Sequence, residues 1–169
     1  WQPKDSLRFI MNMQYSTSTN VPRFDRMNEY KDGELKFAEW YYGPQQRWLS
    51  SLKTTIKSKS KWFNVANFIV AYQNIDEDRV NRRLGSDTRT YRFEDVNVFS
   101  LNADFVRGID TAKTFYYGLE STFNDVVSTA HDQDINTGIE SPSQTRYPDG
   151  GAQMQTHAAY VNYNWQFTP

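Results

Sequence analysis

Apolar and polar residues alternate along several long stretches of the chain, and the segment 155–167 shows this most clearly. Its odd and even positions separate into two sets, namely His157, Ala159, Val161, Tyr163, Trp165 and Phe167 against Thr156, Ala158, Tyr160, Asn162, Asn164 and Gln166. Because successive side chains of a β-strand point to opposite faces, the segment predicts a strand with one apolar and one polar face. It is longer than the usual strand of about 5–6 residues and long enough for the roughly 9–11 residues of a tilted membrane-spanning strand.

Similar alternation predicts six long strands in all, at about 7–16, 47–57, 62–75, 90–107, 114–127 and 155–167. Wide polar loops are expected at about 17–46, 76–89 and 128–153, with short turns at 58–61 and 108–113. Within the first loop, Asp32 and Gly33 predict the tip of a small hairpin over 30–35. Loops that alternate between long and short are typical of outer-membrane barrels, which have brief periplasmic turns and larger outer loops. The pattern therefore predicts an all-β, antiparallel, up-and-down transmembrane β-barrel domain over 1–169.

The alternation assigns each strand residue to one side of the expected barrel wall. The lipid-facing row is predicted to contain Phe9, Met11, Leu52, Phe68, Val70, Leu101, Phe105, Leu119, Val161 and Tyr163. The lumen-facing row is predicted to contain Asn12, Gln14, Lys53, Asn102, Asp104, Glu120, Asn124, Asn162 and Asn164.

Six strands are too few for a closed barrel, because known bacterial barrels begin at about 8 strands. A sheet edge left open in hydrocarbon would leave backbone N–H and C=O groups unpaired. We therefore expect this chain to be a partial barrel completed by strands outside it. The start at Trp1, without Met or a leader-like segment, predicts a piece of a longer protein or a mature form.

Composition agrees with a barrel but does not require one. Hydrophobic residues make up 38% and the mean hydropathy is −0.80, which excludes a transmembrane helix and leaves strands as the means of crossing a membrane. The aromatic share of 16% suits the water–lipid boundary, although aromatic residues also favour ordinary strands. The net charge of −1 gives no reason to expect nucleic acid, and the absence of Cys excludes disulfides and Cys-based metal sites.

Four strings spread over the chain resemble TonB-dependent outer-membrane receptors of the Bacteroidetes type. They are QYSTSTNVPRFDR at 14–26, LKFAEWYYGPQ at 35–45, AYQNIDEDR at 71–79 and TRYPDGG at 145–151. The resemblance implies a location in the bacterial outer membrane and an interior portion of a 22-stranded barrel, whose plug domain is not recognisable in this chain. It also implies import of a scarce nutrient (an iron chelate, cobalamin or an oligosaccharide) driven by the TonB complex.

The partners implied by the resemblance are outer-membrane lipid, the TonB complex through the plug region, and a small nutrient ligand. A surface lipoprotein or other chains of a larger complex are further candidates. No cofactor, metal or catalytic role is expected, since the two His residues and the scattered carboxylates match no catalytic motif.

Candidate ligand-binding residues combine cations with aromatic rings in the expected outer loops, because such pairs clamp sugars and anionic groups. They are Arg23, Arg26, Trp40, Tyr41, Tyr42, Arg79, Arg82, Arg146 and Tyr147. Other accounts stay open for each group: a self-packed loop with an aromatic rim for the first five, a solvated charged loop for Arg79 and Arg82, and turn chemistry for 147–151.

Two other functions compete with the receptor. A soluble β-sandwich, for example a carbohydrate-binding module, would bury the same aromatic residues in a protein core or present them to sugar. A passive porin-type barrel would share the strands but lack a plug domain.

Overall fold

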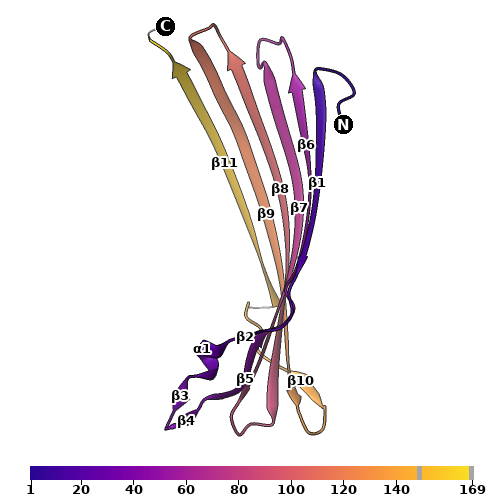
Figure 1. Ribbon diagram of the computed structural model, residues 1–169, viewed down its shortest axis with the longest axis vertical. Coiled ribbons are helices and arrows are strands. Elements are labelled where there is room, and N and C mark those ends of the chain that lie inside the picture. The colour runs from indigo at the N-terminus through magenta and orange to yellow at the C-terminus, as the bar shows by residue number, and fades with distance from the viewer. Residues whose placement is uncertain (148–149, 168–169) are drawn as a thin grey trace.

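The computed structural model describes residues 1–147 and 150–167, and shows one large antiparallel sheet (Figure 1). Its long strands are β1 (Leu7–Thr17), β6 (Gln46–Lys57), β7 (Val65–Arg83), β8 (Thr88–Gly108), β9 (Lys113–Asp134) and β11 (Gly151–Trp165). They lie side by side in the order β1-β6-β7-β8-β9-β11, so each long strand pairs with the next long strand along the chain. The predicted all-β, antiparallel, up-and-down arrangement is confirmed at this level.

The remaining elements are short and gather at one end of the sheet. They are β2 (Val21–Pro22), α1 (Phe24–Met27), β3 (Tyr30–Lys31), β4 (Glu34–Leu35), β5 (Phe37–Tyr42) and β10 (Glu140–Pro142). We call this end, at the bottom of Figure 1, the loop end, and the opposite end with the connections 58–64 and 109–112 the turn end. The β3–β4 pair confirms the small hairpin, with Asp32 at φ 55° and Gly33 at φ 88° at its tip.

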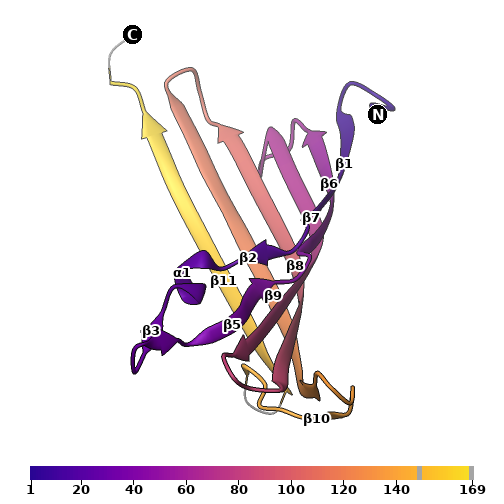
Figure 2. The ribbon, with the colours of Figure 1, turned by 60° about the horizontal axis from the view of Figure 1, so that its bottom comes forward.

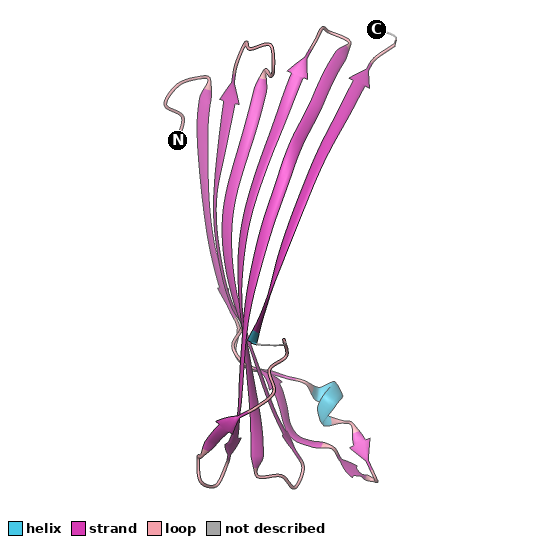
Figure 3. Ribbon diagram, turned by 180° about the vertical axis from the view of Figure 1, so that it is seen from behind, coloured by secondary structure: helices cyan, strands magenta, loops and turns pink. Residues whose placement is uncertain are grey.

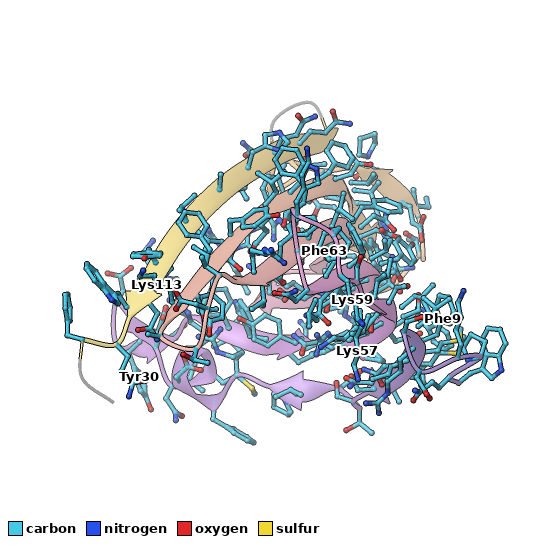
Figure 4. The ribbon with its side chains drawn as sticks, turned by 90° about the horizontal axis from the view of Figure 1, so that it is seen from above. Phe9, Tyr30, Lys57, Lys59, Phe63 and Lys113 are labelled. Carbon is cyan, nitrogen blue, oxygen red and sulfur yellow. The ribbon has the colours of Figure 1, made fainter. Side chains whose placement is uncertain are left out.

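The sheet is open within the described residues. β1 and β11 form its two edges and do not pair with each other (Figures 2 and 3). Seen along the strands the sheet is curved, with Phe9 of β1 towards one side and Lys113 at the start of β9 towards the other (Figure 4). The described residues therefore form no closed barrel, and closure by further strands stays a prediction.

The loop predicted at 76–89 was wrong, because most of it is strand. β7 continues to Arg83 and β8 starts at Thr88, so only 84–87 connects them. Similarly, β9 runs to Asp134, well into the range 128–153 that predicted a loop. The residues of these extensions pair with the neighbouring strands, and their charged side chains alternate between the two faces. The backbone hydrogen bonds between antiparallel strands do not depend on apolar side chains, so a charged segment can form a strand.

The register separates the two predicted rows onto opposite faces of the sheet. Met11 lies opposite Leu52, Leu52 opposite Val70 and Val70 opposite Leu101, which gives one continuous apolar row across four strands. Every residue predicted to face lipid lies on this side, which we call the apolar face. Every residue predicted to face the lumen lies on the other side, which we call the polar face.

Aromatic pairs border the apolar face towards both ends. On the side of the turn end, Phe105 stacks on Tyr117 at 5.0 Å between ring centroids, and Phe115 contacts Tyr163 at 5.7 Å. On the side of the loop end, Tyr72 contacts Phe99 at 4.8 Å. In the same loop-end row, Tyr15 contacts Trp48 at 6.3 Å. Beyond this row the face becomes polar, with Asn74 and Asn97 both donating hydrogen bonds to Asp95 at 3.1 and 2.6 Å.

No layer of described residues covers the apolar face. Ala66 and Val80 are the buried hydrophobic residues of the described chain, whereas Leu101, Leu119 and Val161 are 48%, 61% and 70% exposed. The chain exposes 11653 Å². A folded soluble monomer of its mass, 19.9 kDa, would expose roughly 8,700 Å². The excess surface is that of a single-layer sheet, and it needs another material to cover it.

Helices contribute little to this fold. Among the described residues, no helix has both the length and the apolarity to cross a membrane.

The polar face is closely packed around Gly118. A methyl group there would lie 2.5 Å from Cε1 of Tyr160 and 2.8 Å from the carbonyl oxygen of Ala103. The Tyr160 hydroxyl of β11 donates a hydrogen bond of 2.9 Å to Asp104 of β8, so the ring crosses the glycine on β9, the strand between them. Glycine is therefore required by space at this position.

We predict that Gly118→Ala lowers the free energy of unfolding of the full-length protein by about 1–3 kcal/mol, because the ring and a backbone carbonyl must move. Urea unfolding in detergent or lipid measures the change. Gly108→Ala is the matched control, since its nearest atom lies at an ordinary 3.5 Å. Equal losses in the two variants would contradict the packing described for Gly118.

Candidate functional site

Strands β7, β8 and β9 extend past the apolar region and carry charged residues on both faces of the loop end. β8 is 21 residues long, about 70 Å at the usual rise per residue. The apolar and aromatic rows occupy the half nearer the turn end, and the other half carries the charges. This second half, with β5 and the loop 143–147 beside it, holds the candidate site.

Two aromatic rings of β5 hold two arginines on the polar face. Trp40 and Tyr42 contact each other edge to face at 5.2 Å. The guanidinium of Arg23 lies 4.9 Å from the Trp40 ring and 5.4 Å from the Tyr42 ring, and it donates a 2.6 Å hydrogen bond to the Tyr42 hydroxyl. The guanidinium of Arg79 also lies over the Tyr42 ring, 5.2 Å from its centre. Asp25 completes the group, since hydrogen bonds from Arg23 lower the pKa of Asp25 to about 2.

A pocket of about 390 Å³ opens beside these rings, and its wall is strongly basic. The cations are Lys36, Arg79, Arg83, Arg92 and Arg146, and the two rings are Phe37 and Trp40. The register shifts between Phe37 and Glu39, so β5 has a bulge there. Because of this bulge, both rings project on the polar face, opposite Arg83 and Asn81.

The opposite face carries a separate ion-pair network centred on Glu39. Arg82 donates a 2.9 Å hydrogen bond to Glu39, and Arg89 donates two, of 2.8 and 2.9 Å. Hydrogen bonds from Arg89 and then Arg82 lower the pKa of Glu39. Tyr41 pairs with Val80 and belongs to this face too. This network gives each of its two arginines an ion pair with Glu39 and joins three strands.

The predicted site residues therefore divide into groups. The structure brings together Arg23, Trp40, Tyr42, Arg79 and Arg146 at the polar face. Tyr41 and Arg82 lie on the opposite face and do not reach the basic pocket. Arg26 forms an exposed ion pair with Glu29. Tyr147 lies under Arg146, with 6.0 Å from the guanidinium to the ring, while 148 and 149 of the predicted turn lie outside the described residues.

Sequence reasoning missed Lys36, Phe37 and Arg92, and it placed Arg83 in the charged loop at 76–89 without choosing it as a site residue. Arg83 follows Arg79 by four residues, so the two share a face of any strand that contains both. That signal was hidden because the segment was predicted to be a loop. Arg92 lies within the predicted strand 90–107, but its partner Arg79 was placed in the loop at 76–89, so the sequence did not show that the two lie opposite each other.

A buried carboxylate, Glu94, lies on the polar face two residues along β8 from Arg92, towards the apolar half of the sheet. Glu94 is 5% exposed, and neither of its carboxylate oxygens accepts a hydrogen bond from the described residues. It lies opposite Glu77 on β7 and opposite the fully buried Ser128 on β9. Burial raises the pKa of Glu94, and the positive charges of Arg79 and Arg146 oppose that rise.

Comparison with known proteins adds no family. The chain matches no protein-family model, no curated protein and no solved structure. The resemblance to TonB-dependent receptors therefore stays a prediction from the sequence.

We predict that Glu94→Gln raises the free energy of unfolding at pH 8 by about 1 kcal/mol, because it removes a buried charge without a hydrogen-bond partner. A carboxyl whose pKa is raised by folding binds its proton more tightly in the folded state, so stability falls as pH rises from the unfolded pKa through the folded one. The variant should lose that part of the pH dependence. Urea unfolding of the full-length protein between pH 4 and 8 measures both effects.

Glu77→Gln is the matched control, since it also removes one carboxylate from the same rung. Glu77 accepts two hydrogen bonds from Arg79, of 2.9 and 2.5 Å, so its loss should lower stability. Destabilisation of the Glu94→Gln variant at pH 8 would contradict the unpaired state of Glu94.

Proposed function

We propose that this chain forms part of the barrel wall of a TonB-dependent outer-membrane receptor that binds and imports a scarce nutrient. The observation that carries the proposal is the exposed apolar face of a single-layer sheet, bordered by aromatic pairs towards both ends. Outer-membrane barrels present an apolar band of this kind to lipid, with aromatic girdles at the two interfaces. The polar face then lines the lumen, and the loop end lies outside the cell.

The open edges at β1 and β11 are an argument for further strands outside this chain. Within the described residues, β1 and β11 pair on one side only along most of their lengths. In hydrocarbon, unpaired backbone groups cost several kcal/mol each, so both edges require partner strands. Further strands of the same barrel supply such partners without leaving an edge.

The soluble β-sandwich has less support. A sandwich packs the apolar face of one sheet against a second sheet about 10 Å away. Here the second sheet of the described residues is only the two-stranded β3–β4 hairpin, and the apolar face stays uncovered. A passive porin would have the same kind of barrel wall. Binding to TonB distinguishes an importer from a passive porin.

We predict that the two faces differ in their tolerance of charge. Leu101→Arg in the full-length protein should cost about 2–4 kcal/mol of folding free energy in a bilayer, because it puts a cation in contact with lipid. Asn102→Arg is the matched control on the next residue, and should cost less than about 1 kcal/mol, because it lies on the polar face near Glu120. Urea-driven unfolding from phosphatidylcholine vesicles measures both. Equal costs at the two positions would contradict the assignment of lipid and lumen.

Localisation and energy coupling test the receptor itself. The full-length protein should sediment with the outer membrane, run faster on gels unless it is boiled, and bind purified TonB. A monodisperse protein in buffer without detergent would overturn the membrane assignment. Correct membrane insertion without TonB binding would favour the passive porin.

A further inference from the structure

The basic pocket contains more positive charge than its own partners neutralise. Lys36 pairs with Glu29 at 2.9 Å, and Arg79 pairs with Glu77. Over residues 1–147 and 150–167, no ion pair involves Arg83, Arg92 or Arg146. By contrast, the network around Glu39 on the opposite face binds both of its arginines.

The backbone register places like charges against each other in this pocket. Arg79 lies directly opposite Arg92 in the β7–β8 ladder, and Arg83 follows on the same face of β7. Like charges directly opposite each other destabilise a sheet. Such an arrangement becomes favourable when an anion lies between the guanidinium groups, because each can then donate charge-assisted hydrogen bonds.

The neighbouring rung has the opposite charge. Moving from the pocket towards the apolar half of the sheet, the next pair on the same face is Glu77 opposite Glu94. Glu94 is buried and belongs to no ion pair of the described residues, so this rung places carboxyl groups beside the arginines of the pocket. An anion that entered the pocket would be attracted by the arginines and repelled by this rung. The pocket would therefore hold the anion at the loop end.

The aromatic rings give the pocket a second kind of contact. Trp40 and Phe37 line the same wall as the cations. Apolar parts of a ligand can pack on such rings while its charged groups accept hydrogen bonds from the guanidinium groups. The rings therefore add a surface for any apolar part of the anion.

We propose that this pocket is the docking site for a small ligand that carries at least two carboxylate or phosphate groups, held between Arg92 and Arg146 with Trp40 beside it. The inference rests on the proposed function, because the barrel places the pocket on the lumen side of the outer mouth. It narrows the nutrient to an anionic one and assigns a binding role to Arg92, which the sequence did not single out.

Calorimetry on the full-length protein in detergent tests the inference with three probes: citrate, pyrophosphate and the neutral sugar maltotriose. Citrate, pyrophosphate or both should bind, and binding should weaken as NaCl is raised. Arg92→Gln and Arg146→Gln should each weaken it about tenfold or more, because each removes a charged hydrogen-bond donor. Binding of citrate alone identifies a carboxylate ligand, and binding of pyrophosphate alone a phosphate ligand.

Lys53→Gln is the matched control, since it removes one positive charge from the polar face far from the pocket. It should leave the affinity within about twofold of the unchanged protein, because screening at ordinary salt limits charge effects to about 10 Å. Trp40→Phe should weaken binding less than the arginine variants and should remove most of the ligand-induced change in tryptophan fluorescence.

Three results would overturn the inference: no heat from either anion at millimolar concentration, preference for maltotriose, or an equal loss in Lys53→Gln. Heat-dependent gel mobility is measured on every variant, so a folding defect is recognised separately. If the protein inserts and binds TonB but no anion binds, this inference fails and the receptor stands. If the protein is soluble without detergent, the receptor proposal fails whatever the anions do.

Discussion

The structure depends on an uninterrupted antiparallel ladder of six long strands, in which each long strand pairs with the next without a register shift. Because side chains alternate along a strand, a slip of one residue in any pair would move a whole row to the other face. The rows through Leu52, Val70 and Leu101 and through Lys53 and Asn102 stay separate across the sheet. This separation gives one face that needs an apolar environment and one that needs water.

The same ladder continues beyond the apolar region, and there it serves a different purpose. Near the loop end both faces carry charged residues, so this part of the strands positions charges. On one face Glu39 joins Arg82 and Arg89 and stabilises the extension. On the other face the bulge in β5 brings Phe37 and Trp40 to the basic pocket. The long strands thus connect a membrane-spanning wall, as proposed, to a candidate ligand site through one rigid element.

Much of the fold could be predicted from the sequence, because alternation is a local signal. The six long strands, the hairpin at Asp32 and Gly33, and the side of each predicted lipid or lumen residue all followed from it. The loop-end bounds of β7 and β9 did not, since their charged and polar residues were interpreted as loop. The same misinterpretation explains why only some of the predicted site residues lie at the pocket. Arg79 and Arg82 are three residues apart, so a strand must place them on opposite faces, and only Arg79 reaches the pocket.

Accessibility to lipid and to water at consecutive positions of β8 tests the central claim most directly. This chain contains no cysteine, so Leu101→Cys and Asn102→Cys each give one defined attachment point in it for a nitroxide spin label. With the full-length protein in vesicles, the account predicts that the label at 101 collides mainly with oxygen dissolved in lipid, and the label at 102 mainly with a water-soluble nickel complex. Equal accessibility at the two positions, or burial of position 101 from both reagents, would contradict it.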